Sequence, residues 1–156
     1  MAVKIDKTDL KILKILQKDG RITNLQLSNQ VGLSPAPTLE RVRKLEKQGI
    51  IDSYHANVNA DKLGLGIMAI IQVSLVRQRD NSLQNFKRQI IEIDEVLECL
   101  QVTGTFDYQL KVVVKDISAF DALISERLSR VEEIGQMQTY VVLSTLKKSN
   151  VLPLKY

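Results

Sequence analysis

The first fifty residues carry hydrophobic positions at the three- and four-residue spacing of an amphipathic helix. Leu10, Leu13 and Leu16 begin this pattern, and a polar residue followed by Gly20 ends it. Because residues at this spacing share one side of a helix, they predict a first helix with one buried face.

Two further helices are predicted, joined by a very short turn. Thr23 can cap a short helix over residues 24–31, and Gly32 provides the left-handed backbone that often ends a helix. After this three-residue turn, a third helix is predicted over residues 35–48, with Ser34 as its N-cap and a proline at its first position. Its inward residues are expected to be Leu39, Val42 and Leu45.

The pattern changes after the third helix. Residues 50–58 alternate well enough for a short strand, and residues 59–66 form a polar connector with two glycines. We therefore expect a domain over residues 1–58, a hinge over 59–66, a second domain over 67–148 and a tail over 149–156.

The second domain shows the pattern strand, helix, strand, strand, helix, strand. The expected strands are 67–76, 96–103, 107–114 and 137–146; the expected helices carry Leu83 to Ile93 and Ile117 to Leu128, the latter capped by Asp116 or Ser118. This order builds an antiparallel sheet with both helices on one face, the ferredoxin-like fold. The predicted class is α+β, with a helix-turn-helix domain followed by a ferredoxin-like βαββαβ domain.

The helices leave one face of that sheet uncovered. Neighbouring apolar pairs, Ile70 with Ile71 in the first strand and Val141 with Val142 in the last, indicate that both sides of these strands are buried. A second copy of the same sheet is the simplest cover, so we expect at least a dimer.

Charge is distributed unevenly along the chain. The first 60 residues hold ten of the 22 Lys and Arg residues and six of the 18 Asp and Glu residues, so the net charge of +4 falls entirely within them. A basic segment is either a solvated surface or the partner of a polyanion such as nucleic acid.

Helix geometry favours the polyanion. Two helices joined by a three-residue turn with glycine lie across each other, so the second of them can enter the major groove of DNA. At 100° per residue, the outer side of the third helix carries Pro37, Glu40, Lys44 and Lys47, with Arg41 and Arg43 at its flanks.

The predicted contacts with double-stranded DNA fall into two groups. The N-terminal part of such a helix reads base edges, which selects Ser34, Pro35, Ala36, Pro37, Thr38, Glu40 and Arg41. Arg41 can bond guanine through two donors, and Thr38 can contact a thymine methyl group. The residues suited to phosphates are Arg21, Arg43, Lys44 and Lys47.

Three segments resemble one known family. They are DGRITNLQLSNQVGLSPAPTLERVRKLEKQGII (residues 19–51), VTGTFDYQLKVVV (102–114) and TYVVL (139–143). Together they resemble the Lrp/AsnC family of prokaryotic transcription regulators, and most of all its leucine-responsive branch. The resemblance implies a three-helix winged or extended helix-turn-helix joined by a hinge strand to a ferredoxin-like domain, which pairs into dimers and often into octamers.

The resemblance also implies a site for a free amino acid, such as leucine, and no other cofactor. Carried over by position, the site residues are Leu100, Gly104, Thr105, Phe106, Asp107, Tyr140, Val141 and Val142. Backbone N–H groups near Gly104 can hold the ligand's carboxylate, and Asp107 can bind its ammonium group. Thr105 stands where family members often carry an acidic or amide residue, so the preferred amino acid stays open. Asp107 can equally be a structural acid at the start of a strand.

Two alternatives belong to other functional classes: a small enzyme on the same scaffold, and an amino-acid sensor without DNA binding. The lone His55 and the single Cys99 are far apart in sequence, and no metal-ligand spacing, phosphate loop or nucleophile motif is present. We therefore predict no enzyme and no metal site. One cysteine, no secretory signal pattern and no long apolar run predict a cytoplasmic protein away from membranes.

Overall fold

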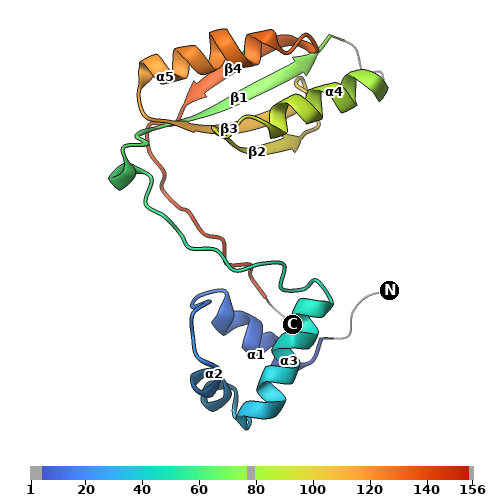
Figure 1. Ribbon diagram of the computed structural model, residues 1–156, viewed down its shortest axis with the longest axis vertical. Helices are drawn as coiled ribbons and strands as arrows, with labels where there is room; N and C mark the ends of the chain where they lie inside the picture. Colours follow the sequence, from blue (N-terminus) through green and yellow to red (C-terminus); the bar gives the residue numbers. More distant parts are fainter. Residues whose placement is uncertain (1–4, 77–79, 155–156) are drawn as a thin grey trace. The chain divides into compact units, whose positions relative to one another are not determined.

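The computed structural model describes residues 5–76 and 80–154. The chain divides into two compact units (Figure 1). The first unit consists of Met1–Asn57 and Lys147–Tyr156, and the second unit of Val58–Leu146. The expected tail of residues 149–156 falls within the segment that returns to the first unit, and its last two residues lie outside the described chain.

The first unit contains the three predicted helices: α1 (Lys7–Leu16), α2 (Asn24–Val31) and α3 (Pro35–Lys47). Thr23 caps α2 and forms a reciprocal pair of hydrogen bonds with Gln26, and Gly32 ends α2 with a φ of 78°. Asp6 caps α1 in the same reciprocal way with Asp9. These caps satisfy N–H groups that would otherwise lack partners at the helix starts, which is why short local motifs define the helix boundaries.

Three details of the first unit differ from the prediction. Ser34 stands at the N-cap of α3, but its side chain makes no capping hydrogen bond. Leu39, expected to point inward, is 38% exposed, whereas Thr38 is fully buried, so the inner face of α3 is rotated by about one residue. Residues 50–58 run without helix or strand, because they pair with no neighbouring strand in the described chain.

The second unit has the predicted βαββαβ order. Its elements are β1 (Ile67–Leu75), α4 (Asp80–Ile91), β2 (Val96–Gln101), β3 (Tyr108–Val114), α5 (Ile117–Ala122) and β4 (Ile134–Val141). The strands lie in the order β2-β3-β1-β4, and each neighbouring pair is antiparallel. The two edges of the sheet are therefore β2 and β4.

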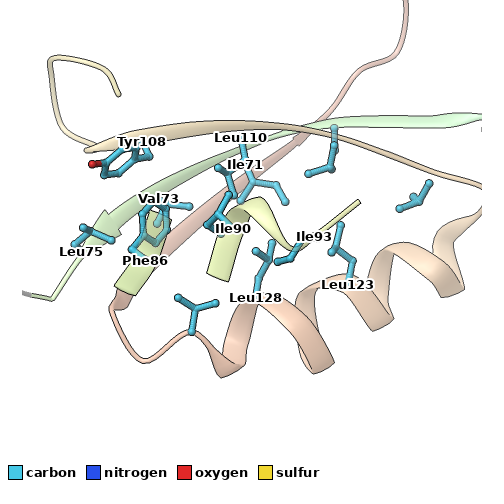
Figure 2. Close-up of a cluster of buried hydrophobic side chains, with 14 residues drawn as sticks. Ile71, Val73, Leu75, Phe86, Ile90, Ile93, Tyr108, Leu110, Leu123 and Leu128 are labelled. Atoms are coloured by element: carbon cyan, nitrogen blue, oxygen red, sulfur yellow. The ribbon is translucent and has the colours of Figure 1, made fainter. Parts of the chain in front are cut away.

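The core of this unit lies between the sheet and its two helical segments. Figure 2 shows Phe86, Ile90 and Ile93 of the α4 region and Leu123 and Leu128 beyond α5 on the same side of the strands. The rings of Phe86 and Tyr108 pack with centroids 4.7 Å apart. Both helical segments thus cover one face, and the other face carries Met68, Ile70, Lys111, Leu100 and Tyr140.

Two boundaries in the second unit differ from the prediction. After α5 the backbone widens into a π-helical turn, Leu123–Arg127, which places Leu123 in the core, while Ile117, expected in the apolar stripe, is 65% exposed. β4 begins and ends earlier than the predicted 137–146, because only Ile134–Val141 pairs with β1; Leu143 and Leu146 are almost fully exposed.

The neighbouring residues Ile90 and Ile91 of α4 provide a matched test of the core. Ile90 is 2% exposed and Ile91 is 78% exposed. We expect Ile90→Ala to lower the free energy of unfolding by about 2–5 kcal/mol, since it leaves a cavity. The control Ile91→Ala should change it by less than about 0.5 kcal/mol. Denaturant titration of both variants measures the difference, and equal losses would contradict this description of the core.

Candidate functional site

The outer face of α3 is a continuous exposed stripe. Its exposed residues are Pro35, Ala36, Pro37, Glu40, Arg43, Lys44 and Lys47, and Arg21 and Ser34 are exposed nearby in sequence. At 100° per residue, the residues from Ala36 to Lys47 in this set lie on one side of the helix. We call these seven residues of α3 the basic stripe. It begins with alanine and proline side chains and ends with the three cations Arg43, Lys44 and Lys47.

The inner face of α3 is buried, and it holds one residue that sequence reasoning had placed outside. Leu45 is 2% exposed and Thr38 is fully buried. The Thr38 hydroxyl donates to the carbonyl oxygen of Ser34 at 3.0 Å, so its polar atom bonds within its own helix. The structure therefore does not bring Thr38 to the basic stripe.

Arg41 faces α1. Its Nη1 lies 2.6 Å from Oδ2 of Asp6 and 2.7 Å from Oδ1 of Asp9. The Asp9 side chain is 7% exposed, so one of these two carboxylates is largely withdrawn from water. In this arrangement the Arg41 guanidinium is bonded to the start of α1 and is not turned toward the outer side of α3.

Hydrogen bonds shift the pKa values of Asp6 and Arg41. The backbone N–H of Asp9 and then the Arg41 guanidinium hold the pKa of Asp6 below its ordinary value of 3.8. The same hydrogen bonds, to Asp6 first and then to Asp9, raise the pKa of Arg41. Sequence reasoning missed this cluster, although Asp6 and Asp9 at a three-residue spacing on one side of a helix start are a visible signal for a shared cation.

A second contact fixes the start of α3 against α2. The Asn24 side-chain amide donates to the carbonyl oxygen of Pro35 at 2.8 Å. On α2, Ser28 is fully buried, and its hydroxyl donates to the carbonyl oxygen of Leu25 at 2.8 Å. A small side chain on the buried side of α2 allows close packing, so the first turn of α3 is held in a defined position.

The loop between β2 and β3 contains four of the expected ligand residues. Gly104 has a φ of 125°, which favours glycine. The Asp107 carboxylate accepts from the backbone N–H of Leu75 at 2.8 Å, and the Asp107 N–H donates to the carbonyl oxygen of Val73 at 2.9 Å. The Ser74 hydroxyl donates to the carbonyl oxygen of Thr105 at 3.4 Å. The loop that also holds Phe106 is thus bonded to the end of β1.

The other expected ligand residues lie elsewhere on the sheet. Tyr140 and Val141 are each 47% exposed, and Val142 follows them after the end of β4. Tyr140 pairs with Ile70, whereas the Thr105 carbonyl meets Ser74, about 13 Å further along β1. Leu100, 48% exposed, lies on the opposite edge strand from Tyr140. A single chain therefore brings Leu100 close to the loop, because Val102 just after it bonds Asp107, but leaves Tyr140 and Val141 apart from both.

Features of other functional classes are sparse in the described parts of the chain. His55 lies 2.7 Å from the Ser53 hydroxyl, and Cys99 is exposed on β2. Within the described residues, no group of three or more His, Cys, Asp or Glu side chains is arranged to hold a metal ion. No helix there has the length and apolarity needed to cross a bilayer.

Two protein-family models match the chain, one over the three helices and one over the sheet. Residues 5–52 match a family model described as winged helix-turn-helix DNA-binding. Residues 68–152 match a model described as the Lrp/AsnC ligand binding domain. The first match contains α1, α2 and α3, and the second contains the sheet except Ile67, the first residue of β1.

Similar proteins cover nearly the whole chain. The leucine-responsive regulatory protein of Escherichia coli is 42% identical over 97% of this chain and 92% of its own length. A transcriptional regulator of Neisseria meningitidis, solved with L-Met, has a TM-score of 0.92 at 37% identity and covers 96% of this chain and 97% of its own. AsnC of E. coli has a TM-score of 0.87 at 26% identity, over 96% of this chain and 99% of its own.

The ion pair at Asp6 generates a pH-dependent prediction. Because the pKa of Asp6 is depressed in the folded state, its charge stabilises the fold above pH 3.8, and this stabilisation is lost as the pH falls through the folded-state pKa. We expect Asp6→Asn to be less stable than the unchanged chain at neutral pH, with the difference disappearing in strong acid.

Denaturant titrations at a series of pH values measure this difference. Asp52→Asn, which removes an exposed carboxylate from the same unit, is the matched control and should show little change. A stability loss for Asp6→Asn that stays constant down to strong acid would contradict the charge assignment.

Proposed function

The chain belongs to the Lrp/AsnC family and is a DNA-binding transcription regulator with a ligand-binding domain, not an enzyme; from this premise we propose that the basic stripe of α3 contacts duplex DNA and that a free amino acid modulates the binding. The observation that carries the proposal is the exposed basic stripe on a helix whose opposite face is buried. A regulator of this kind acts where the DNA is, so we place it in the cytoplasm.

The basic stripe suits the two kinds of DNA contact. Pro35, Ala36, Pro37 and Glu40 lie in its N-terminal part, which reads base edges in helix-turn-helix proteins. Arg43, Lys44 and Lys47, together with Arg21, supply charge for phosphates. The small side chains at the start of α3 permit a close approach of backbone to the base edges, and Glu40 can accept from cytosine.

We assign Arg41 a positioning role in DNA binding. Its guanidinium already bonds Asp6 and Asp9, and a base contact would require it to leave two carboxylates. Arg41 therefore holds α3 against α1 at the angle at which the basic stripe meets the groove. Thr38, buried on the inner face, acts in the same way through packing.

Salt dependence tests the DNA contact without knowledge of the operator. We expect the affinity for a random-sequence duplex to fall steeply as salt rises, since each neutralised phosphate contributes a slope of about 0.9 in log affinity against log salt. Lys47→Ala should weaken binding to all sequences and reduce the slope by about one unit. Lys87→Ala, an exposed lysine on α4, is the control. A flat salt dependence, or an unchanged slope in Lys47→Ala, would refute the contact.

The ligand we propose is an amino acid. The family domain is a ligand-binding domain, one relative is named for its leucine response, and another was solved with L-Met. In this chain, the backbone around Gly104 can donate to a carboxylate. The Asp107 carboxylate, which accepts from the N–H of Leu75, carries the negative charge that a ligand's ammonium group pairs with.

A second copy of the chain would complete the ligand site. In one chain, Leu100 lies on β2 next to the loop at Gly104–Asp107, whereas Tyr140 lies on the opposite edge strand and further along the sheet. The face of the sheet without helices carries Met68 and Ile70, which favours pairing with another sheet. We propose a dimer through this face and further assembly, up to an octamer, that brings the two groups of ligand residues together.

Calorimetry with a panel of amino acids tests the ligand and the site. We expect saturable binding of L-leucine or L-methionine, weakened about 10- to 100-fold in Asp107→Asn, because a charge-assisted hydrogen bond contributes about 1.5–3 kcal/mol. Asparagine keeps an oxygen that can accept from Leu75, so the loop should stay in place. Asp121→Asn, an exposed acid on α5, is the control.

The mass in solution, measured with and without the amino acid, reports the assembly. An Asp107→Asn variant that binds as tightly as the unchanged chain would remove Asp107 from the ammonium site. A monomer that binds the amino acid fully would remove the shared site.

A further inference from the structure

The last described residues of the chain are bonded to α1. We call Lys147 to Leu154 the C-terminal strap. The backbone N–H of Leu152 donates to Oε1 of Gln17 at 2.6 Å, and Nε2 of Gln17 donates to the Leu152 carbonyl oxygen at 3.5 Å. One side-chain amide thus imitates the two-bond pairing of a β-ladder. The strap lies within the first unit, although it follows β4 of the second unit in sequence.

The strap also contributes to the core of the first unit. Leu154 packs against the buried cluster that contains Ile12 of α1 and Leu45 of α3. Leu152, by contrast, is 67% exposed. The strap is therefore held by one amide pair and one principal apolar side chain.

The surface beneath the strap is incompletely filled. A cavity of about 460 Å³ is lined by Leu13 and Leu16 of α1, Ile51 and Tyr54 after α3, and Leu152 of the strap. Atoms that line such a space lack contacts on one side, so the strap packs less tightly than a core segment does. A segment held in this way can dock and release while the three helices stay folded.

α1 connects the strap to the basic stripe through direct contacts. At its C-terminal end, Gln17 bonds the strap, and at its N-terminal end, Asp6 and Asp9 bond Arg41 of α3. In the other direction, the strap follows Tyr140–Val142, which are proposed ligand residues, with only four residues between them. The sequence of contacts runs from the end of β4 through the strap and α1 to α3.

We propose that the C-terminal strap couples the ligand-binding unit to the DNA-binding helix, by docking on α1 in one state and releasing it in another. The proposal rests on the proposed function, because it names the path by which the amino acid acts on DNA binding. The docked and released strap provide the two states that such coupling requires.

The test compares Gln17→Ala and Leu154→Ser with the control Leu146→Ser in the full-length protein. Leu146 precedes the strap and is 99% exposed. Hydrogen exchange of α1, measured without ligand, should be about tenfold faster in both strap variants and unchanged in the control. The ratio of duplex-DNA affinities with and without L-leucine or L-methionine should fall to about one in the strap variants, while calorimetry shows unchanged ligand affinity.

The two measurements separate the proposals. Unchanged exchange of α1 in both strap variants overturns the strap proposal, and so does a preserved affinity ratio where ligand binding is intact. A wild-type chain that binds DNA and ligand with no effect of one on the other overturns it as well. A wild-type chain that binds no amino acid contradicts the proposed function instead, and the exchange measurement then decides on the strap alone. If Leu154→Ser fails to fold, Gln17→Ala carries the same comparison.

Discussion

The direction in which α3 presents its charged side depends on how firmly its opposite side is held. Leu45 is buried in the cluster shared by all three helices, and Arg41 bonds two carboxylates at the start of α1. Burial alone is non-directional and allows some rotation, whereas charge-assisted bonds select one angle. Together they turn three short helices, each too short to be stable alone, into a rigid support.

The local sequence predicted the limits of the three helices, but it did not predict which residues of α3 are buried. The cap at Thr23 and the glycine at position 32 act within a few residues, so the helix limits followed from the pattern. The contact of Arg41 with Asp9 spans 32 residues and depends on helix packing, which no local pattern contains. For the same reason, the burial of Thr38 in place of Leu39 was not predicted, because it follows from the angle between α2 and α3.

The second unit shows where alternation is informative and where it is not. The order of its elements followed from periodicity, since central strands such as β3 are apolar on their buried side. The end of β4 did not, because Leu143 and Leu146 continue the apolar pattern beyond the last residue that pairs with β1. The π-helical turn at Leu123–Arg127 shifts the helical period by one residue, which a fixed 3.6-residue spacing cannot represent. Predicting which of the ligand residues lie close together required the order of the strands in the sheet, which the sequence pattern does not contain.

Two separate stretches of the chain, one before Val58 and one after Leu146, belong to the first unit, so the second unit is inserted between them. A ribosome makes residues 58–146 before it makes Leu154, which completes the cluster around Ile12. The sheet can therefore finish folding during synthesis before the strap is made, and the three helices, which already share a core, receive the strap afterwards. A chain cut before Lys147 would keep the sheet and the three helices but lose the packing of Leu154, so the two units would form without the segment that joins the end of β4 to α1.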